Sequence, residues 1–171
     1  MNLFVTSLSP TLAAQSLCDI RLRKMILETA QLLCTELRRR GADYMPYKPT
    51  HPMHPVTLSL RNDATLLWAE EYFVELHKEY IFRFGKDHKS FVDCFPKISY
   101  AIGQFVNIKA SCLIFANCAR NDSLGLDFTH TNIVYAYQLY LSARWERDIR
   151  PPIWTNRGAP AWHKAITENS A

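Results

Sequence analysis

No stretch of this chain is long and apolar enough to cross a bilayer, since a spanning helix needs roughly 20 consecutive apolar residues. The start of the chain, Met1 to Val5, lacks the charged region and apolar core of a signal peptide. Only five residues are glycine, and no low-complexity tract or internal repeat occurs. These absences exclude an integral membrane protein and a largely disordered chain, and predict an ordered cytoplasmic protein without membrane contacts.

Metal-ligand spacings and cofactor motifs are also missing. The five cysteines form no C-x-x-C pair, so neither a thiolate zinc site nor a disulfide framework is indicated, and we expect reduced packing residues. His51 and His54 lie three residues apart, but the intervening prolines forbid the regular helix on which such pairs usually bind metal. No G-x-G-x-x-G, G-x-x-x-x-G-K or G-x-S-x-G sequence occurs. We therefore expect no metal and no cofactor.

The chain does have enough apolar sequence for one core. Hydrophobic residues make up 48% of its 171 residues, a length that favours one domain over two, and we expect residues 1–171 to form a single domain. The net charge is +4, with arginines and lysines gathered towards both ends of the chain. Such clustering permits a polyanionic partner without requiring one.

Apolar residues at helical spacing predict helices in the first half. A short helix over residues 9–16 opens on serine and proline, and a long helix over residues 19–40 can be capped by Asp19 and ended by Gly41. Residues 42–55 hold four prolines, which rule out regular structure and predict a surface loop.

The second half contains both clear and ambiguous segments. Asn62 can cap a helix that Gly85 stops. Residues 99–109 and 111–120 could each be a short helix or a buried strand, because periodicity cannot decide for runs this short, and we favour helix.

Thr129 or Thr131 then caps a last helix ending at Arg150, since Pro151 disfavours helical geometry in the residue before it. The predicted fold is all-α, a compact helical bundle with long loops and an extended aromatic and basic C-terminal segment.

Glu28 is the first candidate for chemistry. On a helix it lies at the margin of the apolar face, near Arg21 and Lys24, and a carboxylate at a core edge among cations is a candidate site. The alternative is an ordinary Lys24–Glu28 surface pair at i,i+4, which contributes only about 0.3–0.5 kcal/mol.

Nucleic-acid contacts are indicated by the aromatic and basic mixture in residues 150–162 and in the proline-rich loop. Aromatic rings stack on exposed bases, arginines contact phosphates, and proline keeps a segment extended. The alternative is that both tail tryptophans fold back over the core. The candidate nucleic-acid-binding residues are Arg21, Arg23, Tyr47, Lys48, His51, His54, Arg61, Arg150, Trp154, Arg157 and Trp162.

Two resemblances extend this interpretation. Residues 1–5 (MNLFV), 24–33 (KMILETAQLL), 47–51 (YKPTH) and 54–55 (HP) resemble a family of small uncharacterised phage proteins, a likeness that supplies no activity. The order of features is also similar to the phage pyrimidine-dimer DNA glycosylases of the endonuclease V type. These are compact helical enzymes that excise a damaged base and cut at the abasic site.

The glycosylase resemblance rests on three short motifs. The family's D-x-H-x6-E pattern is matched by Asp19 and Glu28, with Arg21 in place of the histidine. Its R-P-T-W-Y tail resembles residues 150–154 with one residue inserted, and its H-V-T resembles residues 54–57. The resemblance implies that Glu28 is catalytic and that neighbouring cations bind DNA.

The nucleophile in that family is the N-terminal amine, uncovered when methionine is removed before a small residue. Here Asn2 follows Met1 and usually retains it, so the resemblance implies the amine of Met1 or a lysine such as Lys24 as nucleophile. Catalytic candidates are thus Glu28, Lys24 and Met1.

Several functions remain open at this stage. The first is a DNA base-processing enzyme acting on a damaged duplex, or a phage hypermodification enzyme acting on an altered pyrimidine. The others are a non-catalytic nucleic-acid-binding module and an interaction protein directed at a host enzyme. The substrate and the oligomeric state are not readable from the sequence.

Overall fold

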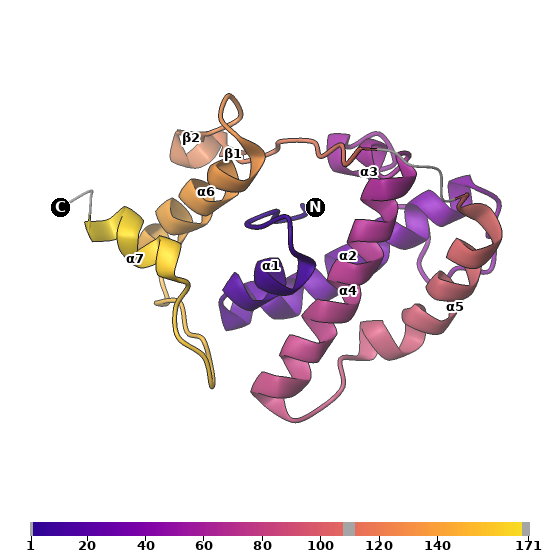
Figure 1. Ribbon diagram of the computed structural model, residues 1–171, viewed down its shortest axis with the longest axis horizontal. Coiled ribbons are helices and arrows are strands. Elements are labelled where there is room, and N and C mark those ends of the chain that lie inside the picture. The colour runs from indigo at the N-terminus through magenta and orange to yellow at the C-terminus, as the bar shows by residue number, and fades with distance from the viewer. Residues whose placement is uncertain (1, 108–111, 169–171) are drawn as a thin grey trace.

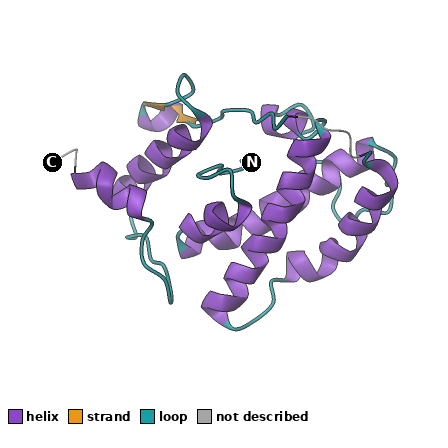
Figure 2. Cartoon of the chain, viewed as in Figure 1, coloured by secondary structure: helices purple, strands orange, loops and turns teal. Residues whose placement is uncertain are grey.

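The computed structural model describes residues 2–107 and 112–168. The regular secondary structure of this part of the chain is helical apart from one small hairpin, which confirms the predicted all-α class (Figure 2). A 3₁₀ helix, η1, connects the two antiparallel strands of the hairpin. The elements are α1 (Pro10–Ser16), α2 (Asp19–Arg39), α3 (Pro55–Ser59), α4 (Asp63–Phe84), α5 (Lys89–Phe105), β1 (Arg120–Asn121), η1 (Asp122–Leu124), β2 (Leu126–Asp127), α6 (Ile133–Arg147) and α7 (Ala161–Glu168).

Helix α2 is central to the arrangement, with α4 and α5 packed on it and α1 packed on α4. Helices α6 and α7 pack on each other on the opposite side of the molecule. Figure 1 shows the first residues, in indigo, lying in the middle between α6 and α4. The N-terminal segment therefore joins the two groups of helices.

Buried apolar side chains form one continuous cluster that runs from the N-terminal segment through α1 to α6. Tyr72, Phe73 and Tyr137 are its largest fully buried members. Among the helices of the described residues, none combines the length and the apolar character needed to cross a membrane.

Several predicted helix ends are confirmed. The Ser9 side chain accepts a hydrogen bond from the Leu12 amide at the start of α1, and the Asn62 side chain accepts one from the Thr65 amide at the start of α4. Gly85 ends α4 with the positive φ of 63° that glycine adopts without a steric penalty.

Two predicted caps are wrong. Cys18, and not Asp19, is the N-cap of α2, because the Asp19 carboxylate instead accepts hydrogen bonds from Arg83 and from Thr155 in the tail. Asn132, and not a threonine, caps α6 through its side-chain oxygen. Helix α6 ends at Arg147, three residues before the predicted end.

The segment after α4 departs most from prediction. Helix α5 extends from residue 89 to residue 105, so residues 99–105 of the predicted 99–109 helix are helical and residues 106–107 are not. Residues 112–119 are not helical and form no regular secondary structure, and residues 108–111 lie outside the described part of the chain. Ile114 in this segment is fixed to α4, since its amide donates to the Thr65 hydroxyl oxygen and its carbonyl accepts the hydroxyl proton.

Candidate functional site

Glu28 lies at the edge of the α2 face that packs into the core, and its side chain is only 14% exposed. Its Oε2 accepts a hydrogen bond of 3.1 Å from the backbone amide of Asn2. Its Oε1 lies 3.3 Å from Nζ of Lys24, whose side chain is 64% exposed. The carboxylate is therefore held between the start of the chain and an accessible amine.

The pairing with lysine alone does not distinguish Glu28. Glu75 and Lys78 on α4 form a comparable pair, in which the glutamate side chain is 14% exposed and the lysine side chain 66% exposed. The contact with Asn2 is what sets Glu28 apart. This near-identity makes Glu75 a matched control for any test of Glu28.

Asn2 is itself fixed by hydrogen bonds to two parts of the fold. Its side-chain oxygen accepts a bond from the amide of Leu3 and another from the hydroxyl of Tyr137 on α6. The Tyr137 oxygen in turn accepts a bond from the amide of Cys118. The N-terminal segment is thus bonded to both α2 and α6 beside Glu28.

Two buried phenols adjoin this cluster. Burial, the neighbouring Tyr137 and the charge of Glu28 raise the pKa of Tyr72, and burial also raises the pKa of Tyr137. Both side chains therefore stay protonated at neutral pH. Within the described residues the Tyr72 hydroxyl has no hydrogen-bond partner, so it is a free donor inside the core.

His54 contributes a neutral imidazole near the same carboxylate. Burial lowers its pKa, as do the positive charge of the amino terminus and His51, while the charge of Glu28 opposes them. Nδ1 of His54 accepts a hydrogen bond from the amide of Val56 and caps α3, which requires that nitrogen to be unprotonated.

Burial raises the pKa of the nearby Cys118 thiol, which argues against a thiolate nucleophile there.

These groups suit chemistry at an electron-poor carbon. The Glu28 carboxylate can stabilise developing positive charge or accept a proton, and Lys24 supplies an amine within reach. Met1, the other predicted nucleophile, lies outside the described residues.

A basic hollow of about 610 Å³ lies at the junction of α2 and the end of α6. In it the Arg21 guanidinium forms two hydrogen bonds, of 2.9 and 2.7 Å, with the Asp148 carboxylate. The hollow is also lined by Arg144, Arg147 and Arg150, and no ion pair involves these three among the described residues. The hollow therefore carries positive charge beyond what Asp148 neutralises.

Arg21, Lys24 and Glu28 have helical spacings of three and four, which place them along one side of α2. Seven residues correspond to about 10 Å along a helix axis. The basic hollow is thus about two turns of α2 away from the carboxylate.

Other predicted contact residues are placed apart from this face or are engaged within the fold. The Arg23 guanidinium lies 4.7 Å from the centre of the Phe84 ring. The Tyr47 hydroxyl bonds to Ser90 on α5. Three residues of the predicted set are exposed in or beside the proline-rich loop, namely Lys48, His51 and Arg61.

The basic run at the end of α2 stabilises the fold. Arg38 donates to the carbonyl of Tyr47, and both Arg39 and Arg40 donate to the buried carboxylate of Glu36. These three arginines form a basic cluster in the sequence, but in the fold their guanidinium groups bond to carbonyl and carboxylate groups of the same chain.

The tail folds back over the core. Trp154 donates its indole N–H to the carbonyl of Ser16, and Trp162 stacks on Trp145 with ring centres 5.5 Å apart. Arg157 forms bonds of 2.6 and 2.8 Å to the buried Glu79. The structure thus has the packed arrangement that was the alternative to stacking on bases.

Sequence reasoning missed Asn2, Tyr72 and Tyr137. A tyrosine within an apolar helical face reads as core, and nothing in the sequence pairs Asn2 with a helix 26 residues away. Arg144 and Arg147 were visible only as members of a basic cluster.

Comparison of the chain with protein-family models, with curated proteins and with solved structures finds no match to any of them.

Proposed function

We propose that this protein is a DNA base-processing enzyme of the glycosylase and abasic-site lyase type, in which Glu28 acts beside an amine nucleophile. The observation that carries the proposal is the Glu28 carboxylate, largely shielded from solvent and held between the Asn2 amide and the Lys24 amine. The resemblance to the phage pyrimidine-dimer glycosylases supports the same assignment. A phage origin, a cytoplasmic location and a damaged or hypermodified pyrimidine as substrate belong to this proposal.

In the proposed reaction the neutral amine attacks C1′ of the deoxyribose. The bond between C1′ and the base breaks, and its electron pair leaves with the base, which takes up a proton. The first amine proton passes through Glu28 to the departing base, and the second passes to O4′ as the C1′–O4′ bond breaks, which leaves an imine at C1′ and a hydroxyl at C4′. Glu28 stabilises the positive charge that develops on the sugar and accepts the proton of the amine.

Two amines can fill the role of nucleophile. Lys24 Nζ is exposed and lies 3.3 Å from the carboxylate. The amine of Met1 is the second candidate, supported by the contact between the following residue, Asn2, and Glu28.

DNA binding in this proposal uses the basic hollow. Arg144, Arg147 and Arg150 supply charge for backbone phosphates, and arginine is well suited to that contact because its donors match the phosphate oxygens. A phosphodiester seated there would place the strand along the side of α2 that leads to Glu28.

A non-catalytic nucleic-acid-binding module is the second candidate. The observation that favours it is the basic hollow itself, which can hold phosphates without any contribution from Glu28. The two candidates differ in whether a covalent intermediate forms.

The test is incubation of the purified protein with ultraviolet-irradiated, abasic and undamaged duplexes in the presence of borohydride, which reduces an imine to a stable adduct. We expect an adduct on the irradiated or abasic duplex and none on the undamaged one. Peptide mass spectrometry then assigns the adduct to Met1 or to Lys24. Salt-sensitive binding with no adduct and no strand cleavage on any duplex would instead support the binding module.

A further inference from the structure

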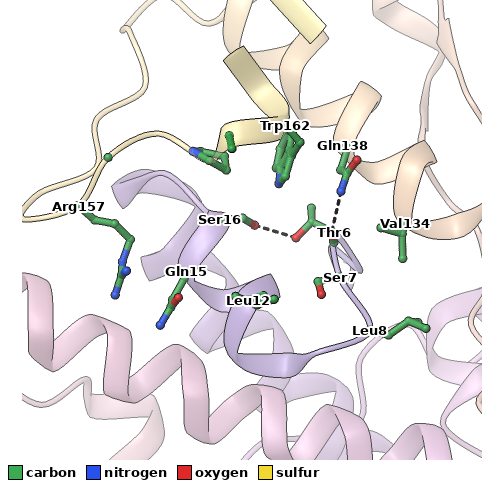
Figure 3. Close-up of a pocket in the computed structure, with 13 residues that line it drawn as sticks. Thr6, Ser7, Leu8, Leu12, Gln15, Ser16, Val134, Gln138, Arg157 and Trp162 are labelled. Carbon is green, nitrogen blue, oxygen red and sulfur yellow. Dashed lines mark hydrogen bonds between the residues drawn. The ribbon is translucent and has the colours of Figure 1, made fainter. Parts of the chain in front are cut away.

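A second hollow, of about 560 Å³, is lined by the N-terminal segment, α1, α6 and the start of α7 (Figure 3). This volume falls in the range of about 300–1,000 Å³ that is typical of small-molecule sites. Glu28, Lys24 and the basic hollow do not line it. It is a separate feature from the candidate active site.

Its walls are mostly apolar and include leucine side chains that are exposed and lie outside the buried core. Leu8 and Leu12 line the hollow and are 57% and 58% exposed, although a leucine gains stability from burial. Trp162 forms the opposite wall and is fixed by its stacking on Trp145. The hollow therefore offers apolar surfaces, one of them a rigid indole.

Some polar groups of the hollow are already satisfied. The Ser16 hydroxyl donates to the carbonyl of Ala13, so in its 2.7 Å bond with Thr6 the Thr6 hydroxyl must be the donor. The amide nitrogen of Gln138 donates to the Thr6 carbonyl.

Arg157 is the one cation among the described residues that line the hollow, and it is neutralised by Glu79. The Arg157 guanidinium is directed to Glu79 through two hydrogen bonds, and in Figure 3 its side chain runs from the tail towards α4. A ligand of this hollow therefore does not need to be an anion.

Other polar groups are free to bind a ligand. In the described part of the chain no hydrogen bond engages the side-chain amide of Gln15, the side-chain oxygen of Gln138 or the indole N–H of Trp162. The Ser7 oxygen accepts a bond from the Ser9 amide, which leaves its proton available. The hollow thus presents donors and acceptors among apolar walls.

We propose that this hollow binds a nucleobase. An uncharged, flat heterocycle with hydrogen-bonding groups around its edge matches apolar walls, a neutral charge balance and free amide groups. A glutamine amide can pair with a base edge through one donor and one acceptor, as it does with adenine. Gln15 lines the hollow, and no hydrogen bond among the described residues engages its side-chain amide.

The base can come from two sources, a free nucleoside or a nucleotide turned out of a strand. The second source rests on the proposed function. Thr6 of the hollow is only four residues along the chain from Asn2, so the N-terminal segment connects the base site with the Glu28 site.

The test is a fluorescence titration with 2-aminopurine riboside, whose emission is quenched on stacking, and calorimetric titrations with the four common nucleosides. A parallel arm uses a single-stranded oligonucleotide that contains 2-aminopurine. We expect saturable binding in the nucleoside arm, the oligonucleotide arm, or both, and the arm that binds identifies the source.

Two variants and one control define the site. Gln15→Ala is expected to weaken binding by about tenfold, which corresponds to the loss of a hydrogen-bonding amide. Leu12→Trp, at an exposed position, fills the hollow and is expected to abolish binding. Gln31→Ala removes a glutamine on α2 that is also partly buried but does not line the hollow, and is expected to bind as the parent protein does.

Absence of saturable binding in both arms overturns the inference, and so does binding that Leu12→Trp leaves unchanged. Adduct formation on an abasic duplex needs no base in this hollow. Adduct formation without nucleobase binding would therefore overturn this inference alone, and nucleobase binding without an adduct would support it while the proposed enzyme chemistry fails.

Discussion

Arg83 illustrates how individual charges stabilise this fold. Its side chain is fully buried, and its guanidinium is 2.9 Å from the Asp19 carboxylate and 2.7 Å from that of Glu79. It also donates to the carbonyls of Leu17 and Gln15. Arg83 therefore connects α4 to the α1–α2 junction, and Glu79 extends the network to the tail.

Replacement of this guanidinium should be strongly destabilising. Arg83→Met leaves the largely buried Asp19 carboxylate without its arginine and leaves Glu79 paired with Arg157 alone, and breaking a buried pair in this way costs about 3–5 kcal/mol. We expect that loss in the free energy of unfolding, measured by urea denaturation. Arg23→Met is the control, since its exposed contact with Phe84 contributes about 0.5–1 kcal/mol. Equal losses in the two variants would disprove the structural role of Arg83.

The same network explains why Asp19 is not a helix cap. Burial raises its pKa, but hydrogen bonds from Thr155 and Arg83 outweigh that effect and hold the pKa below its ordinary value. A carboxylate at the start of a helix reads as a cap in the sequence. Partners 64 and 136 residues away are not visible there.

At the scale of elements, two histidines cap helices in the same manner. His54 Nδ1 accepts a bond from the Val56 amide at the start of α3, and His88 Nδ1 accepts one from the Ser90 amide at the start of α5, both at 3.2 Å. Burial is the main cause that lowers the pKa of each.

These caps predict a pH dependence. Because the folded pKa lies below the ordinary value of 6.5, the neutral form stabilises the fold above that pH, and the contribution falls as the pH drops through the folded pKa. We expect the free energy of unfolding to decline between about pH 7 and pH 5. The double variant His54→Asn/His88→Asn keeps a side-chain acceptor but does not titrate, so its decline should be shallower.

His77 and His163 also contribute to the slope, since burial lowers their pKa as well. A double variant with the same pH profile as the parent protein would show that the two caps do not contribute.

The elements that the sequence predicts well are those with local signals. The serine cap of α1, Asn62 and Gly85 act within one helical turn, so their effect is readable from neighbouring residues. The non-helical segment over residues 112–119 is different, because the bonds between Ile114 and Thr65 join residues 49 positions apart. An apolar run of that length has no local feature that separates helix from extended chain.

At the scale of the whole molecule, the distribution of charge decides where a polyanion can bind. Several arginines form ion pairs within the fold. Arg39 and Arg40 pair with Glu36, and Arg157 pairs with Glu79. Within the described part of the chain, Arg144, Arg147 and Arg150 form no ion pair, and they make a concentrated positive surface beside α2.

Salt dependence tests this distribution. If Arg144, Arg147 and Arg150 contact phosphates, each change to glutamine should reduce the slope of log K against log salt concentration by about 1. The slope is measured by fluorescence anisotropy of a labelled duplex between about 50 and 200 mM salt. Lys86→Gln, at an exposed position outside the hollow, should leave the slope unchanged. Equal slopes for all four variants would rule out the hollow as the phosphate site.

The sequence predicts only the part of the candidate site whose residues are close together along the chain. Lys24 and Glu28 are one helical turn apart, so their pairing follows from helical spacing. Asn2 and Tyr137 are bonded across 135 residues, and their meeting depends on how the N-terminal segment fits between α2 and α6. The position of the N-terminal segment depends on the complete fold, and no sequence motif predicts it.

The central claim is that the Glu28 carboxylate acts in catalysis, and the most direct test compares Glu28→Gln with Glu75→Gln. Turnover is measured on the duplex that gives a borohydride adduct, with urea denaturation to verify that both variants are folded. The account predicts that Glu28→Gln lowers turnover by about 100-fold or more while Glu75→Gln retains it, since only Glu28 adjoins the start of the chain. Parental turnover in a folded Glu28→Gln variant would contradict it.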